Sequence, residues 1–202
     1  MSRYAMVIDV ERCIGCNTCV VACKAEHNTP NGIFCTTIHE AEIGQFPDVR
    51  RLFIPALCNH CERAPCVDVC PTGASHIRED GIVAIDWDRC IGCKACIAAC
   101  PYHARCGVED RRILMADGRT VFENPTIAPC PERVPVKCDF CAHRIDAGNP
   151  VPACVEVCPT SARIFGDLDD PQSEVSLLVV RHHARCLLPD KKTSPRVFYI
   201  GD

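Results

Sequence analysis

Cysteine spacing constrains this chain more than any other feature of its sequence. Twenty of the 202 residues are cysteine. Such a density in a small protein indicates disulfides or bound metal, because a short chain needs a source of order beyond its apolar core. Sixteen of the cysteines fall into four closely spaced groups, which are Cys13-x2-Cys16-x2-Cys19-x3-Cys23, Cys58-x2-Cys61-x4-Cys66-x3-Cys70, Cys90-x2-Cys93-x2-Cys96-x3-Cys100 and Cys138-x2-Cys141-x12-Cys154-x3-Cys158. The four cysteines outside the groups are Cys35, Cys106, Cys130 and Cys186.

The four groups repeat along the chain. The loop Cys13-Ile14-Gly15-Cys16 matches Cys90-Ile91-Gly92-Cys93, and residues 65–72 match residues 153–160 around their shared Cys-Val-x-Val-Cys-Pro-Thr. The offsets are 77 residues (13 to 90) and 80 residues (58 to 138). Internal repetition of this kind predicts a duplicated unit of two groups. The longest insertion then lies inside the fourth group.

Three kinds of site use closely spaced cysteines. The third group has the bacterial ferredoxin spacing C-x2-C-x2-C-x3-C-P, whose fourth cysteine ligates a second iron–sulfur cluster. The proline ends the helical turn, because it cannot continue the hydrogen-bond ladder. Structural zinc usually takes two C-x2-C pairs with longer gaps, and cysteines within one such loop are poor disulfide partners. The spacing therefore favours iron–sulfur clusters over zinc and disulfides.

Charge and hydropathy narrow the class of protein. The formal net charge of −4 does not indicate nucleic-acid binding. Four 4Fe–4S clusters, each about 2− with its thiolates, would bring that charge from −4 to about −12 and give nearby Lys and Arg an electrostatic purpose. No apolar run approaches the roughly 18 residues of a membrane-spanning helix, and the start does not resemble a secretion signal. We expect a soluble chain that, if exported, travels with another protein.

Between the cysteine groups, the sequence predicts a loop-rich α+β fold ordered mainly by metal, so the metal-free chain should fold poorly. A helical turn is expected over 20–26, and Asp170 with Pro171 predicts the start of a helix that continues to about His182. Gly44 and Pro47 should separate two short strands. The expected strands are 4–10, 33–39, 50–55 and 195–200, with hairpins over 76–86 and 112–122 and a loop over 124–135.

The chain resembles the four-cluster iron–sulfur subunits of the dimethyl sulfoxide reductase superfamily, above all those of arsenate, polysulfide, thiosulfate and tetrathionate reductases. The resemblance covers nearly the whole chain. Beyond the cysteine groups, it rests on Met6-Val7-Ile8-Asp9, Leu57-Cys58-Asn59-His60-Cys61, Cys100-Pro101-Tyr102, Lys137-Cys138-Asp139-Phe140-Cys141, 166–173 and 195–200. The stretch His103-Ala104-Arg105-Cys106 departs from relatives, in which a small residue often follows Cys-Pro-Tyr.

The resemblance implies how sixteen cysteines hold four 4Fe–4S clusters. Its fold is two ferredoxin-like halves related by a pseudo-twofold axis, each around two clusters. The halves would be 1–50 with 130–165, and 51–129, followed by a C-terminal helix and docking tail over 166–202. The implied ligand sets are site a (Cys13, Cys16, Cys19, Cys158), site b (Cys23, Cys138, Cys141, Cys154), site c (Cys58, Cys61, Cys66, Cys100) and site d (Cys70, Cys90, Cys93, Cys96).

The resemblance also implies a function. Such subunits carry electrons to or from a large catalytic subunit that holds molybdenum or tungsten in a bis-pterin (molybdopterin, bis-MGD) cofactor, and many also dock on a membrane quinone-reactive subunit. We expect an electron wire without catalytic residues of its own, periplasmic by co-export with the catalytic subunit. The alternatives are a cytoplasmic complex, a formate dehydrogenase or hydrogenase subunit, and a stand-alone polyferredoxin or redox sensor.

The sequence allows either a functional or a purely structural role for several other residues. Lys24 and Lys94 lie beside cluster cysteines and would either raise a cluster's reduction potential or remain solvated. His60 and His103 are expected to pack or donate hydrogen bonds rather than ligate iron, because cysteine already supplies every cluster. Trp87 is expected to pack, and the four spare cysteines to act as small hydrophobes. The basic stretches 181–185 and 191–192 are either a solvated face or a docking surface.

Overall fold

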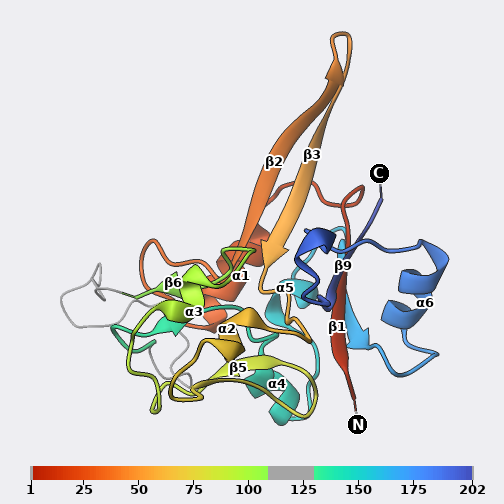
Figure 1. The fold of residues 1–202 in the computed structure, drawn as a ribbon. Helices are drawn as coiled ribbons and strands as arrows, with labels where there is room; N and C mark the ends of the chain where they lie inside the picture. Colours follow the sequence, from red (N-terminus) through yellow and green to blue (C-terminus); the bar gives the residue numbers. More distant parts are fainter. Residues whose placement is uncertain (1, 109–129, 202) are drawn as a thin grey trace.

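A three-stranded sheet joins the two ends of the chain. The computed structural model, which describes residues 2–108 and 130–201, mixes short helices and strands with many loops (Figure 1). Strand β1 (Tyr4–Asp9) pairs antiparallel with β8 (Arg163–Asp167) and parallel with β9 (Val197–Ile200). The strands expected over 4–10 and 195–200 are therefore confirmed in this sheet, and the α+β class is confirmed with them.

Strand β1 is buried on both faces, because its side chains alternate between two layers. Met6 and Ile8 face the main core, which contains many of the cysteines, whereas Ala5 and Val7 face a second apolar cluster with Val175. Val175 belongs to α6 (Glu174–Arg181), which packs against β8 and β1. The strand thus anchors the cysteine-rich core to the C-terminal helix.

A long hairpin projects from the body of the molecule (Figure 1). Its strands β2 (Thr36–Gln45) and β3 (Asp48–Leu57) pair in continuous register from Thr36 opposite Leu57 to Gln45 opposite Asp48. The two strands predicted on either side of Pro47 are therefore present, but they are longer than predicted and Gly44 does not break β2. Gly44 continues β2 at a φ of 99°, which glycine tolerates, and the turn consists of the next two residues after β2. We call this hairpin the arm.

The other elements are short and surround the cysteine groups. Helix α1 confirms the helical turn expected over 20–26, and the hairpin expected over 76–86 is confirmed in β4 and β5. Helix α1 packs against α5, and α2 packs against α3 and β4. These elements are α1 (Thr18–Glu26), α2 (Pro65–Asp68), β4 (Ser75–Ile77), β5 (Val83–Ile85), α3 (Ala95–Ala98), β6 (Cys106–Gly107), β7 (Pro135–Val136), α4 (Ala142–Asp146), α5 (Ala153–Glu156) and the 3-10 turn η1 (Pro189–Lys191).

The C-terminal helix begins later than predicted. Asp170 accepts a hydrogen bond from the backbone N–H of Gln172 at 2.9 Å, so it caps a turn rather than the helix, and α6 starts only at Glu174. The hairpin expected over 112–122 lies outside the described residues, as does most of the loop expected over 124–135. In the described part of the chain, no helix has the length and apolar character needed to span a lipid bilayer.

Candidate iron–sulfur centres

The four cysteines of site a line one cavity. Cys13 and Cys16 come from the loop that leads into α1, Cys19 from the first turn of α1, and Cys158 from the turn after α5. Gly15 shapes this loop, because its φ of 69° is unfavourable for other residues and a Cβ there would approach the ring of Phe53 to 2.5 Å. Ile38 and Pro55 of the arm complete the wall. The base of the arm and site a therefore form one structural unit.

The four cysteines of site b line a second cavity. Cys23 comes from α1 and Cys154 from α5, whereas Cys138 and Cys141 come from the loop before α4. All four are buried. Burial raises the pKa of the Cys138 and Cys141 thiols. Such thiols become thiolates only beside a positive charge such as a metal.

The four cysteines of site c are also buried and lie near one another. The pKa of Cys61 is raised to about 11, mainly by burial. A hydrogen bond with Thr193 lowers it, whereas the neighbouring thiols of Cys58, Cys66 and Cys100 raise it further. Four thiols that share one apolar volume repel one another when ionised. Site c therefore has the same need for a bound cation as site b.

The four cysteines of site d line a third cavity. Burial raises the pKa of Cys70, but hydrogen bonds from the backbone N–H of Ser75 and from Thr72 outweigh it, and the pKa falls to about 7. Cys158 of site a has the matching neighbours, the N–H of Ala162 at 3.2 Å and the hydroxyl of Thr160 at 3.8 Å. Burial would raise the pKa of Cys158, but these hydrogen bonds outweigh burial, so the pKa is lowered as it is in Cys70. These contacts stabilise thiolate ligands.

Exposure divides the four sites into two classes. Cys16 of site a and Cys93 of site d are the exposed cysteines of the chain, while all eight cysteines of sites b and c are buried. The neighbouring Ile14 and Ile91 are 57% and 67% exposed. Sites a and d therefore reach the surface through two equivalent loops with an apolar residue at each tip.

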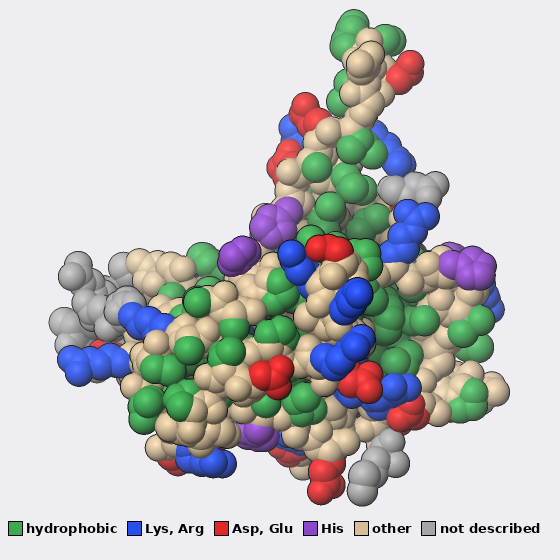
Figure 2. All heavy atoms as spheres, viewed as in Figure 1, with side chains coloured by type: hydrophobic (Ala, Val, Ile, Leu, Met, Phe, Trp, Pro, Cys, Tyr) green, Lys and Arg blue, Asp and Glu red, His purple; other side chains and the backbone are tan. Residues whose placement is uncertain are grey.

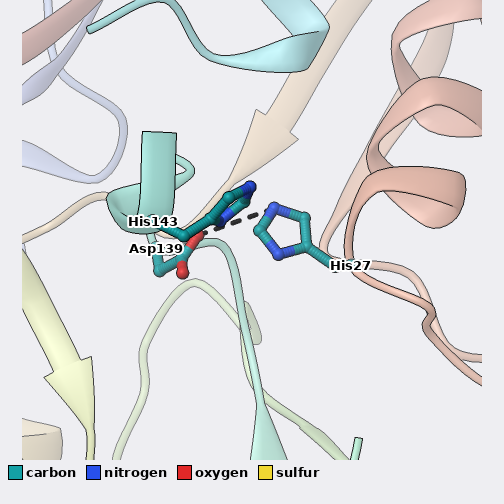
Figure 3. A group of neighbouring side chains, drawn as sticks. All are labelled: His27, Asp139 and His143. Carbon is teal, nitrogen blue, oxygen red and sulfur yellow. Dashed lines mark ion pairs between the residues drawn. The ribbon is translucent and has the colours of Figure 1, made fainter. Parts of the chain in front are cut away.

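The cysteine sites are too wide for a single metal ion. Within the described residues, His27, Asp139 and His143 form the one group of at least three candidate ligand atoms that lie within 4.8 Å of one another (Figure 3). Four thiolates around one zinc ion would lie about 3.8 Å apart, given a Zn–S distance of about 2.3 Å and tetrahedral geometry. No three thiols of sites a to d form such a compact group in the described residues, so the sites do not have the geometry of a single zinc ion.

Hydrogen bonds and ion pairs hold the three side chains of Figure 3 in place. His27 Nε2 lies 3.6 Å from an Asp139 carboxylate oxygen and 3.3 Å from the sulfur of Cys141. His143 Nε2 lies 2.7 Å from a carboxylate oxygen of Glu26. The group therefore braces the corner of site b around Cys141.

The buried charged side chains of the described residues are all cationic: Arg105, Lys137, Arg163 and Arg196. Within the same residues, no carboxylate forms an ion pair with the first three. Arg105 Nε and Arg163 Nη1 have no hydrogen-bond partner. A buried cation without a counter-charge is strongly destabilising, so negative groups belong beside these side chains. Thiolate-ligated clusters of net charge about 2− meet that need.

Two equivalent loops meet between sites b and c. His60 lies between Cys58 and Cys61, and it is fully buried. Its ring stacks on Phe140 with centroids 3.7 Å apart, and its Nδ1 accepts a hydrogen bond from the backbone N–H of Val83. The packing role predicted for His60 is confirmed. His103, the other histidine considered, is exposed.

Lys24 and Lys94 have different surroundings. The ammonium group of Lys24 donates hydrogen bonds to the carbonyls of Thr29 at 2.9 Å and Ile33 at 3.1 Å, so it clamps the loop between α1 and β2 and is not simply solvated. This clamp explains why the strand predicted from residue 33 begins only at 36. Lys94 lines the cavity of site d. Trp87 is 38% exposed, so it packs only in part, and its Nε1–H donates to the backbone carbonyl of Pro135 at 3.3 Å.

The spare cysteines are not members of the four sets, although Cys35 forms a side-chain hydrogen bond with Cys23 of site b. Cys35 and Cys130 are buried, as expected of small hydrophobes, while Cys106 and Cys186 are half-buried and donate S–H hydrogen bonds to backbone carbonyls. All twenty cysteines are free thiols in the structure. Part of the basic C-terminal stretch is held in place, because the backbone N–H of Arg185 bonds the carbonyl of Tyr199 at 2.9 Å.

Comparison with known proteins decides the family. Residues 49–116 and 130–168 match the 4Fe–4S dicluster domain family, and residues 4–25 match a 4Fe–4S binding domain. The chain belongs to the 4Fe–4S dicluster family of iron–sulfur subunits. Members of this family bind multiple 4Fe–4S clusters, and the fourfold cysteine pattern of this chain fits that cofactor. The resemblance stated from the sequence is confirmed.

Named relatives match over nearly the whole chain. The arsenate respiratory reductase iron–sulfur subunit ArrB of Shewanella sp. (strain ANA-3) is 43% identical over 98% of this chain and 96% of its own length. A tetrathionate reductase subunit of Salmonella typhimurium is 42% identical over 98% of this chain and 72% of its own length. A selenate reductase subunit of Mesobacillus selenatarsenatis is 39% identical, with coverages of 98% and 72%.

Proposed function

We propose that this iron–sulfur subunit conducts electrons through four 4Fe–4S clusters bound at sites a, b, c and d. The observation that carries the proposal is the gathering of sixteen cysteines into four sets beside buried cations that lack carboxylate partners. When bound, each cluster takes up and releases one electron. The residues of this chain hold the clusters, exclude water from sites b and c, and contribute no catalytic group.

The exposure of the cysteines supports a linear order a–b–c–d. Arg163 lines the cavities of both site a and site b, Arg105 interacts with cysteines of both site c and site d, and the stacked rings of His60 and Phe140 join the loops of b and c. Only the outer two sites reach the surface. Electrons therefore enter and leave at the loops around Ile14 and Ile91, and they pass through two enclosed sites in between.

The two-half organisation is part of the same proposal. Residues 1–50 with 130–165 would form one ferredoxin-like half and residues 51–129 the other, with 166–202 as the docking tail. The contact between His60 and Phe140 supports a pseudo-twofold axis, because the two residues are equivalent under the 80-residue offset (60 to 140). Equivalent residues that touch each other lie on or near such an axis.

The partner that we propose is a large catalytic subunit with a molybdenum or tungsten bis-pterin site, since relatives are named as subunits of arsenate, tetrathionate and selenate reductases. We place its docking surface along the arm and the adjoining loop of site a. Phe46 at the arm tip is 93% exposed and Val49 is 46% exposed, and apolar side chains follow the arm to its tip (Figure 2). Exposed aromatic anchors are typical of interface hot spots.

Two further points extend the proposal beyond the chain. Site d, at the other end, would exchange electrons with a second partner, for which a membrane quinone-reactive subunit is the candidate. The complex would lie on the periplasmic side of the membrane, carried there by the export signal of the catalytic subunit. Fractionation of cells that express a tagged chain would test the location, and recovery from the cytoplasmic fraction would contradict it.

The first experiment is anaerobic purification of the native complex, with metal analysis and mass spectrometry of the chains that accompany this one. We expect about sixteen irons per chain, from four clusters of four irons, and a large partner with molybdenum or tungsten. A chain recovered alone with full iron would overturn the subunit assignment in favour of a free ferredoxin or sensor. A large partner without pterin metal would indicate a different machine, such as a hydrogenase.

A further inference from the structure

Two arginines occupy equivalent positions that cysteine spacing alone does not reveal. Arg105 follows Cys100 by five residues and Arg163 follows Cys158 by five, each within the motif Cys-Pro-x-x-Ala-Arg. Cys70, the remaining cluster cysteine with a following proline, has Ser75 at this position. The motif therefore places one arginine in each of the two regions that we propose as halves.

Both guanidinium groups are held in the interior in the same way. Arg105 is 3% exposed and Arg163 is 2% exposed. Arg105 Nη1 donates to the hydroxyl of Ser75 at 2.8 Å, and Arg163 Nη2 donates to the hydroxyl of Thr36 at 2.9 Å. A hydroxyl orients each planar group without neutralising it, because Ser and Thr carry no charge. Each side chain therefore presents a fixed positive charge to its surroundings.

Each guanidinium group lies between two cysteine sites. Arg105 Nη2 lies 3.1 Å from the sulfur of Cys66 in site c, and the group also interacts with Cys96 in site d. Arg163 lines the cavities of sites a and b together. Among the described residues, the guanidinium nitrogens without a hydrogen-bond partner include one from each arginine, Nε of Arg105 and Nη1 of Arg163. These donors are available to sulfur atoms of a bound cluster.

We propose that Arg163 and Arg105 are positioning residues for electron transfer, each serving as a shared counter-charge that raises the reduction potentials of the two clusters beside it, a with b and c with d. The proposal rests on the proposed function. A cluster becomes more negative when it accepts an electron, so a fixed cation stabilises the reduced state. Guanidinium keeps its charge under all ordinary conditions. A cation shared by two clusters shifts the potentials of both in the same direction.

The test is a redox titration of the full chain, purified with its partner and followed by electron paramagnetic resonance. Arg163→Gln should lower the potentials of two clusters, and Arg105→Gln should lower those of the other two. We expect at least a tenfold fall in the reduced-to-oxidised ratio at fixed potential, which is about 59 mV for a one-electron couple. Arg105→Lys and Arg163→Lys should retain most of the wild-type potential, because the positive charge remains.

Arg196→Gln is the matched control. Arg196 is also buried and also has an unpartnered Nε, but the charges that act on it are those of Arg3 and of carboxylates, with no cysteine among them. Its replacement should leave all four potentials unchanged. The proposal is overturned if Arg105→Gln and Arg163→Gln shift the same clusters, if neither shifts any, or if Arg196→Gln shifts them equally.

Iron content separates this proposal from the proposed function. A wild-type chain without sixteen irons and four reducible centres would contradict the proposed function itself. Full iron in the wild type, with clusters lost from both the Gln and the Lys variants, would show that the arginines are needed for assembly and would overturn the counter-charge role. Full iron in a Lys variant, with potentials lowered as far as in the Gln variant, would overturn it as well.

Discussion

Phe140 offers the sharpest test of the contact between the loops of sites b and c. Its side chain is 1% exposed, stacks on His60 at a centroid distance of 3.7 Å, and meets Phe165 edge to face at 5.1 Å. Replacing Phe140 with Ala removes both ring contacts and leaves a cavity between sites b and c. The sulfur ligands stay in place, because neither Cys138 nor Cys141 is altered.

The expected loss follows from burial and ring contacts. A fully buried Phe contributes roughly 1.5–3 kcal/mol through the area removed from water. Two aromatic contacts add about 0.5–1.5 kcal/mol each. Those terms sum to roughly 2.5–6 kcal/mol, which includes the measured range of about 3–5 kcal/mol for buried Phe→Ala changes. If the substitution lowers the barrier to unfolding by about 3 kcal/mol, the protein unfolds and loses its clusters roughly 10²-fold faster.

The assay is the loss of visible cluster absorption after an iron chelator is added to the anaerobic, fully loaded protein in moderate denaturant. Phe46→Ala is the matched control, since Phe46 is 93% exposed, and surface substitutions usually stay within about 0.5 kcal/mol. The two variants remove the same atoms from opposite environments. If Phe140→Ala loses its clusters no faster than Phe46→Ala, the packing argument for this contact is refuted.

Three further outcomes are expected. Glu26 pairs with Arg144, whose hydrogen bond lowers the pKa of Glu26 to about 2. The pair therefore stabilises the fold fully above pH 4.5, the ordinary pKa of Glu, and this stabilisation is lost as the pH falls toward 2. Glu26→Gln should lower the free energy of unfolding by about 2 kcal/mol at neutral pH and by less in acid, measured by denaturation of the loaded protein. Phe46→Ser should weaken co-purification with the catalytic subunit without lowering the melting temperature of this chain; unchanged recovery would exclude the arm tip as an anchor. Cys70→Ser should lower the iron count or alter one cluster's spectrum, whereas Cys186→Ser should do neither.

The metal-binding pattern is the part of this protein that the sequence predicts best. Ligand loops are short, so their spacing alone limits which thiols can reach one cluster. The strand at residues 4–9 and the hairpin around Gly81 were equally accessible, because alternation and turn chemistry are local signals. The length of the arm was missed because glycine and proline normally break strands, and here Gly44 lies within a strand while Pro47 forms the turn.

Residues whose roles depend on distant partners were harder to predict. Lys24 clamps backbone carbonyls five to nine residues away, and nothing in its immediate neighbours indicates this. The stacking of His60 on Phe140 joins positions 80 residues apart, although the repeat offset itself could have suggested the pair. The arginines carried a readable signal as well, the twice-repeated Cys-Pro-x-x-Ala-Arg, but its meaning depends on their burial, which only the structure gives.

The distribution of buried charge fits the linear order that we propose for the sites. A cluster of net charge about 2− is costly to enclose, and only sites a and d reach solvent that can offset part of that charge. The junction between a and b holds Arg163, and the junction between c and d holds Arg105. Lys137 lies at the remaining junction, between sites b and c. Its ammonium group donates a hydrogen bond to the carbonyl of Cys138 in site b at 2.7 Å. Burial raises the pKa of Cys66 in site c, and the charge of Lys137 acts on the same thiol in the lowering direction. One buried cation therefore lies at each of the three junctions. If electrons follow the proposed order, each transfer takes place beside a positive charge.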